Sequence, residues 1–457
     1  MTAALHCFAV CLSVGLSAPN AGDPAMARLA ELVAAGDDVT ACLQEMLDAA
    51  GETGGVVELP PGTYRMAGSV RIPEGVTLEG SWRDTVHYIT MDANTVFLLT
   101  GGRGDEDGEP AFTLTSSSGI KGLTIAHPEQ TFPDVVPYPW AIRADGIATH
   151  VENITFINAY QGLQLGPNQS SLHYVKNVYG CVLRRGLYVD ASFDVGRIES
   201  VHFNEHYFSR VDLPGAPKEG LPNKDQVVAN YTRANLEAFI IARDEWGSIR
   251  DTFVYGAKVG YRFITTEHGS FNGKLSGIGA DGCMVCLQIE QTNPYGMLIS
   301  DGQFVAHPRL KPIETFEYDF SSGEEVVQIV TAPESDTPVV LSNCSFWGVS
   351  HHAARLSGAG TVSFSQCIFR GWDGEKEGRA AIHAEAGKVS ATYCQFLEWP
   401  GQQLNAIRLE EGVERAKIIG NMGTSGVRIA NAIGDRAAIA HNDPPRDDAA
   451  TEAAAAP

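Results

Sequence analysis

Carboxylates that could cleave a sugar chain are concentrated between Arg197 and Asp281, where acidic, basic and aromatic residues are dense. Glu245 and Glu267 are the leading catalytic pair, with Asp244 and Asp281 as reserves. Two carboxylates about 5 Å apart repel each other, so the pKa of one rises and that group can act as an acid. The other stays ionised, which is the arrangement that a retaining glycosidase needs. The alternative is that these side chains are solvated acids on an acidic surface.

The spacing of strand ends is what brings Glu245 and Glu267 together. If Val189, Ile241 and Phe263 occupy one inward position on successive turns of a repeat, each glutamate follows four residues after its turn. A slip of one residue in register would move either side chain to the opposite face. With this register, the two carboxylates lie on consecutive turns.

Residues that could hold a sugar surround this pair. The indole of Trp246 offers a flat apolar face that matches the C–H face of a pyranose. An insertion over residues 207–235 is too long for a simple turn and could wall a cleft. His202 and His206 are not spaced like the zinc ligands of a helical HExxH motif, so we expect them to form hydrogen bonds to substrate or to the insertion and not to bind metal. The predicted substrate-binding residues are His202, Asn204, Glu205, His206, Trp246, Arg262 and His268.

Elimination is the second chemistry that this stretch allows. A lyase needs a base and a cation that neutralises the uronate carboxylate, and oxygen ligands suit calcium. Hydrolysis is expected to need no cofactor, so Ca²⁺ is implied only if the protein is a lyase. A third reading is a non-catalytic glycan-binding or structural protein, in which the aromatic residues matter and the carboxylates do not. The basic candidates for elimination are Arg243, Lys258, Arg262 and Lys274, and the calcium candidates are Asp244, Glu245 and Asp281.

The elements that must position these residues are short strands repeated along the chain. Neighbouring runs lie mostly about 20 to 30 residues apart, with insertions at 207–235 and 308–337. A period in this range, with two or three short strands per unit, is typical of a solenoid. The lack of crossover helices argues against a βαβ sheet. The pattern therefore predicts a single all-β parallel β-helix whose coils stack about 4.8 Å apart.

Three cysteines recur at one position of the repeat. Cys344, Cys367 and Cys394 each lie two residues before a phenylalanine that ends a strand. We expect them to point inward and stack as thiols, because disulfides between adjacent parallel strands are geometrically awkward. The lone pair Cys283 and Cys286 lacks the second pair that a zinc ribbon requires, so a buried strand is expected there.

The first part of the repeat is similar to a known family. A helical pattern over residues 29–50 is followed by Gly-Gly-Val-Val-Glu-Leu-Pro-Pro-Gly-Thr-Tyr at 54–64 and by Ile-Pro-Glu-Gly-Val-Thr-Leu at 72–78. This segment resembles the start of the pectate-lyase superfamily, also called glycoside hydrolase family 28-related proteins. The resemblance implies a right-handed parallel β-helix over residues 55–442, with a short capping helix in the segment 23–54.

The resemblance leaves the activity open, since such proteins include hydrolases, lyases, transferases and phage tail depolymerases. The polygalacturonase motifs Asn-Thr-Asp, Gly-His-Gly and Arg-Ile-Lys do not occur in the repeat, where Arg-Ile-Glu at 197–199 only approaches the last of them. A polygalacturonase is therefore disfavoured. A glycoside hydrolase-like enzyme acting on a polysaccharide remains the first expectation.

The composition limits the classes of molecule that this protein is expected to bind. The 457 residues carry 33 Lys and Arg against 55 Asp and Glu, for a net charge of −22. Such a balance argues against nucleic acid and against an anionic membrane surface as partners. A polysaccharide or oligosaccharide is the expected partner, and the sequence does not indicate an oligomeric state. No run of 18 apolar residues predicts a membrane span.

The two ends of the chain carry separate expectations. Residues 1–22 are apolar enough for a signal peptide, although they lack the usual basic residues. Export to the periplasm or the medium is expected, and the alternative is a plain apolar tail. Residues 443–457 are rich in Ala, Asp and Pro and are expected to be disordered.

Overall fold

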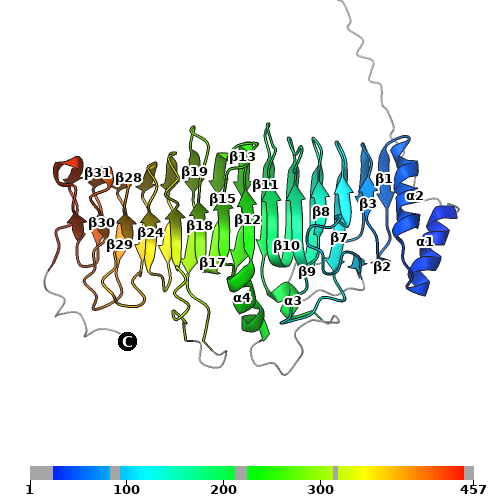
Figure 1. Ribbon diagram of the computed structural model, residues 1–457, viewed down its shortest axis with the longest axis horizontal. Helices are drawn as coiled ribbons and strands as arrows, with labels where there is room; N and C mark the ends of the chain where they lie inside the picture. Colours follow the sequence, from blue (N-terminus) through cyan, green and yellow to red (C-terminus); the bar gives the residue numbers. More distant parts are fainter. Residues whose placement is uncertain (1–23, 83–92, 212–223, 312–316, 447–457) are drawn as a thin grey trace, which may run out of the picture.

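The computed structural model describes residues 24–82, 93–211, 224–311 and 317–446. Within these ranges the chain forms one continuous system of 34 strands. Neighbouring coils pair in parallel, from the first turn at β1 and β4 to the last at β31 and β34. Figure 1 shows the strands stacked along the long axis of the molecule. The predicted parallel β-helix is confirmed, whereas the proposed signal peptide and most of the C-terminal tail lie outside the described residues.

Each coil contributes a strand to each of three ladders. In the first ladder every strand pairs with the corresponding strand of the next coil. Its members are β1 (Gly55–Glu58), β4 (Val76–Glu79), β7 (Gly119–Ala126), β9 (His150–Leu165), β10 (Tyr174–Val189), β11 (Arg197–Phe203), β13 (Glu245–Arg250), β16 (Asn272–Ser276), β19 (Met297–Ser300), β22 (Val339–Ser342), β25 (Thr361–Ser365), β28 (Gly387–Thr392), β31 (Val413–Ile419) and β34 (Ala437–Ala440).

The second ladder shares the long strands β7, β9, β10 and β11 with the first, because these strands run on around a corner of the coil. Its other members are β2 (Gly62–Met66), β5 (Thr95–Leu99), β14 (Phe253–Tyr255), β17 (Gly279–Cys283), β20 (Gln303–Ala306), β23 (Ser345–Trp347), β26 (Ile368–Arg370), β29 (Gln395–Leu397) and β32 (Met422–Gly423).

The third ladder carries the candidate site on its outer face and includes the last residues of β9 and β10. Its other members are β3 (Val70–Ile72), β6 (Phe112–Leu114), β8 (Trp140–Ala144), β12 (Glu237–Ile241), β15 (Val259–Phe263), β18 (Val285–Ile289), β21 (Val327–Thr331), β24 (His352–Leu356), β27 (Ile382–Ala384), β30 (Ile407–Leu409) and β33 (Ile429–Asn431). A short 3₁₀ turn, η2 (Gly434–Arg436), precedes the last strand.

Inward side chains stack from coil to coil and form the core. The ring centroids of Phe346 and Phe369 lie 5.0 Å apart, and those of Phe369 and Phe396 lie 4.9 Å apart. The predicted thiol stack is confirmed, since Cys344, Cys367 and Cys394 are buried and unbridged. Cys283 and Cys286 are also buried and unbridged, as their place in buried strands predicts.

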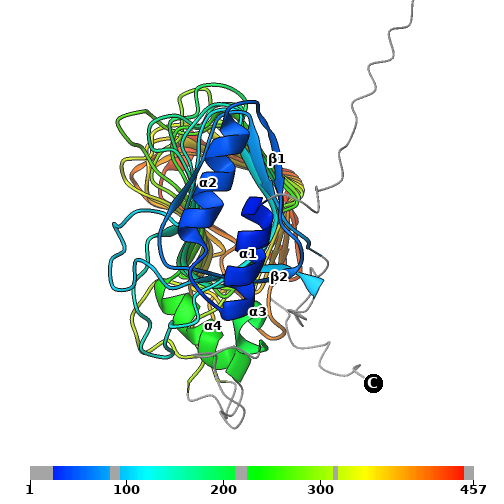
Figure 2. The same cartoon turned by 90° about the vertical axis from the view of Figure 1, so that its right-hand side faces the viewer.

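Helices cover the N-terminal end of the solenoid. One capping helix is predicted, and the structure has two, α1 (Pro24–Ala35) and α2 (Thr40–Gly51). Figure 2 shows both lying across the open end of the first coil. Leu43 and Leu47 of α2 are buried against the core. The end of a solenoid exposes apolar residues and unpaired strand edges, so this cover protects it from solvent.

Long loops between the second and third ladders project from one side of the solenoid. The largest contains α3 (His206–Ser209) and α4 (Lys224–Asn235), which project from the lower side in Figure 1. The second insertion is shorter than predicted, because β21 lies within 308–337 and pairs with β18. The alternating residues Val327 and Ile329 are buried there, so this run belongs to the ladder and the insertion covers 307–326.

Candidate functional site

A groove runs along the outer face of the third ladder, beside the projecting loops. Its volume is about 410 Å³. One column of outward residues crosses it from coil to coil, and each step between coils is about 4.8 Å. In this column Arg143 pairs with Gln164, Gln164 with Tyr188, and Tyr188 with Ile240. We call it the arginine groove; its lining residues are Glu106, Asp107, Trp140, Arg143, Gln164, Arg184, Arg185, Tyr188, Glu237, Ile240, Arg262 and Ile264.

Two arginines of this groove are held by neutral partners. The Nε of Arg143 donates to Oε1 of Gln164 at 2.7 Å, and an Nη of Arg185 donates to Oε1 of Gln161 at 2.9 Å. Among the described residues, neither guanidinium forms an ion pair with a carboxylate. Both side chains are half-buried. They are thus oriented cations whose charge remains for a ligand, and guanidinium binds carboxylate or sulfate groups through paired hydrogen bonds.

The remaining arginines of the groove form ion pairs with glutamates. Arg262 contacts Glu237 at 3.1 Å and Glu290 at 2.7 Å, while Arg184 lies 3.9 Å from Glu237. Arg184 also donates to the carbonyl of Asn235 at the end of α4, which ties the insertion to the groove. Arg262, a predicted substrate-binding residue, therefore lines the groove, although its charge is balanced by two glutamates.

A buried aspartate organises the rim where the third ladder turns toward the first. Asp190 is 3 % exposed and accepts hydrogen bonds from the backbone N–H of Arg243 and the hydroxyl of Thr266. Its other oxygen lies 3.2 Å from the hydroxyl of Tyr188 and 3.1 Å from Nδ1 of His268. Burial, above all, raises the pKa of Tyr188, which keeps that phenol protonated. Asp190 thus fixes the positions of Tyr188 and His268.

Replacing Asp190 by asparagine is expected to lower the free energy of unfolding by about 1–3 kcal/mol, because the new amide N–H₂ would face existing donors. Chemical denaturation monitored by circular dichroism measures this change. Asp145 is the matched control, since it follows the same strand position two coils earlier and also accepts hydrogen bonds from Asn168. Asp145 is more exposed. An Asp145→Asn loss equal to that of Asp190→Asn would contradict the role of burial.

The predicted stacking of Glu245 on Glu267 is wrong, although the register on which it was based is right. Val189 pairs with Ile241, and Ile241 with Phe263, as predicted. Beyond Phe263 the chain forms a tight turn closed by a Thr266–Gly269 bridge, so Glu245 pairs with Asn272 instead. Because of the extra residues in this turn, the residue four positions after Phe263 no longer aligns with the residue four positions after Ile241.

Each of these two glutamates has its own surroundings. Glu267 is exposed in the turn, and its charge acts on Tyr188 at the groove edge. Glu245 forms an ion pair with Arg243, whose guanidinium lies over the ring of Phe193. Neither glutamate points into the core, as predicted. Their catalytic roles stay predictions.

The reserve carboxylates lie apart from each other. Asp244 is fully buried, and burial, as the largest cause, raises its pKa. Asp281 lies in the second ladder, opposite Tyr255, where burial also raises its pKa. Asp244 therefore cannot touch a polymer, and these residues do not assemble into the calcium site that elimination would use. Trp246 is 71 % exposed next to Glu245 and is available for sugar stacking.

The predicted cluster at residues 202–206 lies under the insertion, away from the groove. The ring of His202 packs against Phe253, with centroids 5.2 Å apart. Glu205 is 2 % exposed, and Oδ1 of Asn204 accepts a hydrogen bond from the backbone N–H of His206. Nε2 of His206 lies 3.3 Å from Glu205. These contacts fasten α3 to the solenoid, so direct contact with substrate stays a prediction for these four residues.

The stability of this cluster depends on pH. Burial is the main cause that raises the pKa of Glu205 to about 8, from a usual value of 4.5. Between these two values the folded protein holds a proton that the unfolded chain releases, so stability falls as pH rises through this window. Glu205→Gln should remove this pH dependence. We expect the free energy of unfolding of the variant to exceed that of wild type by at least about 1 kcal/mol near pH 9 and by less near pH 5.

Glu199, on the strand before α3, gives the opposite sign. Its hydrogen bond from Tyr174 leads the causes that lower its pKa to about 2, and Arg250 adds to them. Its stabilisation is present above pH 4.5 and is lost as pH falls toward 2, so Glu199→Gln should be less stable than wild type at neutral pH. Denaturant titrations across pH measure both variants. A Glu205→Gln variant that loses stability at high pH would contradict the assignment.

Sequence reasoning missed most residues of the arginine groove. The predicted site residues all lie between Arg197 and Asp281, whereas Arg143, Arg185, Tyr188 and Asp190 lie on earlier coils. The available signal was the strand-end position already aligned: the residue before Val189 is Tyr188, and the one before Phe263 is Arg262. Following that column toward the N-terminus leads to Gln164 and Arg143.

Comparisons with known proteins support the fold. No model of a protein family matches the chain, and no curated protein matches it. A tailspike protein mutant of E. coli bacteriophage HK620, solved in complex with a pentasaccharide, aligns at a TM-score of 0.56 and 12% identity. That alignment covers 88% of this chain and 75% of the tailspike chain.

The A-module of the mannuronan C-5 epimerase AlgE6 from Azotobacter vinelandii aligns at a TM-score of 0.51 and 12% identity. It covers 90% of this chain and 96% of the module. At such identities the shared property is the solenoid fold. Separately, no helix in the described part of the chain is long and apolar enough to cross a membrane. Across the same residues, no cluster of three His, Cys, Asp or Glu side chains is arranged to hold a metal ion.

Proposed function

We propose that the protein acts on an anionic polysaccharide, which it binds along the arginine groove and cleaves at its glycosidic bonds. The observation that carries this proposal is the pair Arg143 and Arg185, two oriented guanidiniums that form no ion pair with a carboxylate of the described residues, on a chain of net charge −22. A groove of about 410 Å³ that extends across several coils suits a chain of sugars better than a single small molecule. The solved proteins of similar fold include one in complex with a pentasaccharide and one named for mannuronan.

Hydrolysis is the first chemistry that we propose. It requires a carboxylic acid beside the scissile oxygen and a second carboxylate. Glu267 is the leading candidate, because it is exposed at the groove edge beside Tyr188 and the Asp190–His268 pair. Glu245 is the second candidate; it lies on the preceding coil, where it forms an ion pair with Arg243. Glutamine at either position is expected to reduce turnover by at least about 10²-fold if that carboxylate is an acid, base or nucleophile.

Elimination is the second candidate, and the same two arginines favour it. Arg143 and Arg185 could neutralise a uronate carboxylate and so acidify the proton on the adjacent carbon. Tyr188, kept protonated by its surroundings, could donate a proton to the departing oxygen, and His268 beside it could accept one. This chemistry leaves a double bond in the product, whereas hydrolysis adds water.

One assay distinguishes these proposals. Purified protein is incubated with a panel of neutral, uronate-bearing and sulfated polysaccharides, and reducing ends and absorbance near 235 nm are both followed. New reducing ends without absorbance support hydrolysis, and a growing absorbance band supports elimination. Activity only on neutral glycans would overturn the anionic assignment. Binding without any product on the whole panel would establish a glycan-binding protein instead.

A further inference from the structure

A second, smaller cavity lies next to the arginine groove on its N-terminal side. Its volume is about 160 Å³, the space of roughly five water molecules. It lies among the ends of β2 and β5 and the two loops that precede β6 and β8. Trp140 borders both this cavity and the arginine groove. The cavity is therefore large enough for one small ring and adjoins the path of a bound chain.

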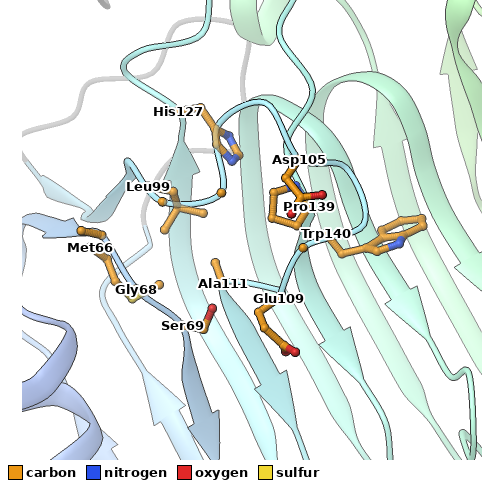
Figure 3. Close-up of a pocket in the computed structure, with 14 residues that line it drawn as sticks. Met66, Gly68, Ser69, Leu99, Asp105, Glu109, Ala111, His127, Pro139 and Trp140 are labelled. Atoms are coloured by element: carbon orange, nitrogen blue, oxygen red, sulfur yellow. The ribbon is translucent and has the colours of Figure 1, made fainter.

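His127 is the buried polar group of this cavity. Its side chain is 2 % exposed, and Figure 3 shows the ring directed inward between Leu99 and Pro139. The backbone N–H donates to Asn158 at 2.8 Å, and the carbonyl accepts from the same amide at 3.0 Å. The ring packs on Tyr138, with centroids 4.3 Å apart. His127 is thus held rigidly in place from two sides.

One ring nitrogen of His127 is free to form a further hydrogen bond. Nδ1 has no hydrogen-bond partner among the described residues, although it is buried. Burial lowers the pKa of His127 to about 3, so the ring is neutral in ordinary conditions. Buried polar atoms are rarely left without a partner, because such a loss reduces stability. A ligand with hydroxyl groups would supply the missing hydrogen bond.

The charged residues that line the cavity are acidic, whereas the groove is lined by both arginines and carboxylates. The acidic residues Asp105 and Glu109 line it from the loop, and no lysine or arginine is among its described lining residues. One oxygen of Asp105 accepts from the backbone N–H of Asp107 at 3.1 Å, which fixes the loop. Carboxylates accept hydrogen bonds from sugar hydroxyls but repel an anionic unit. Figure 3 shows Leu99 and Pro139 facing the same space, where they can contact apolar C–H groups.

We infer that this cavity is a subsite for one neutral sugar ring of the polysaccharide whose anionic part lies in the arginine groove. The inference rests on the proposed function and adds to it that the substrate contains neutral as well as anionic units. Trp140 is the boundary between the two kinds of subsite. The neutral ring donates hydroxyls to Asp105 and Glu109 and shares a hydrogen bond with His127.

The test uses single sugars, so that it does not depend on cleavage. Methyl glycosides of glucose, galactose, mannose, rhamnose and N-acetylglucosamine are the neutral probes, and glucuronate and galacturonate are the anionic ones. Saturation-transfer NMR and titration of tryptophan fluorescence measure binding to the full chain. The expected result is that at least one neutral glycoside binds wild type in the millimolar range.

Two variants locate that binding. Ser69→Trp fills the cavity from an exposed position on its rim, and His127→Phe removes the ring nitrogens. Both substitutions should weaken binding of the neutral glycoside by at least about tenfold, which corresponds to the loss of one or two hydrogen bonds. The Arg143→Gln, Arg185→Gln double variant is the matched control, and it should bind the neutral glycoside as wild type does. Ser69→Trp keeps the test valid if His127→Phe fails to fold.

The outcomes separate the inference from the proposed function. The inference is overturned if no neutral glycoside binds wild type, or if Ser69→Trp binds one as tightly as wild type does. The proposed function is tested separately. It requires that anionic oligosaccharides bind wild type and that the arginine double variant loses this binding. If neutral glycosides bind but anionic oligosaccharides do not, the cavity is a site for neutral sugars, and the claim that it extends the arginine groove is refuted.

Discussion

Replacing Arg143 and Arg185 together by glutamine is expected to weaken binding of an anionic oligosaccharide by about 10²-fold or more. A hydrogen bond to a charged group contributes about 1.5–3 kcal/mol, and each 1.4 kcal/mol is tenfold in affinity. Both guanidiniums are oriented by glutamines and lack carboxylate partners in the described structure, so their charge acts on the ligand. Isothermal titration with a uronate or sulfated oligosaccharide measures the loss. Turnover on the same glycan should fall in parallel.

Arg408 is the matched control for these arginines. It belongs to the same outward column near the far end of the third ladder, where it pairs with His383. It is also half-buried, and it lies outside the arginine groove. Arg408→Gln should leave binding within about twofold of wild type, because surface charges beyond a Debye length of about 8–10 Å are screened. An equal loss in both variants would mean that net charge, and not the groove, attracts the glycan.

Replacing Phe369 by alanine is expected to lower the free energy of unfolding by about 3–5 kcal/mol. Its ring is fully buried between those of Phe346 and Phe396, at centroid distances of 5.0 and 4.9 Å. The lost ring leaves a cavity in the middle of a stack that neighbouring coils cannot close. Denaturant titration followed by circular dichroism measures the change.

Ile368 is the control for this stack, because it adjoins Phe369 on β26 and is 37 % exposed. Its side chain points to the opposite face of the strand, so Ile368→Ala should cost at most about 1 kcal/mol. If the two variants were equally destabilised, the alternation of inward and outward residues on this strand would be in error.

The coil repeat could be predicted from the sequence because inward positions are chemically uniform. The cysteine two residues before Phe346, Phe369 and Phe396 marks one such position on three coils. The aligned residues Val189, Ile241 and Phe263 mark another, and both alignments are confirmed. A stack of buried residues permits little variation in size or polarity, and a shift of one residue would expose it.

The candidate site could not be predicted to the same degree, because its residues depend on turns of variable length. The turn at Thr266–Gly269 adds residues that no inward pattern records, and it separates Glu267 from Glu245. Outward side chains carry no common pattern either, as the succession Arg143, Gln164 and Tyr188 shows. Two of the side chains that contact Asp190, those of Thr266 and His268, come from a later coil, so these contacts likewise have no local signature.

The most direct test of the central claim is a crystal structure of the protein with an anionic oligosaccharide at saturating concentration. We expect the sugar chain to lie along the outer face of the third ladder, with acidic groups about 2.7–3.2 Å from the guanidiniums of Arg143 and Arg185. A ring of the chain should contact Tyr188 or Trp140. A sugar chain bound instead on the outer face of the first ladder, around Lys274 and Leu298, would contradict binding in the arginine groove.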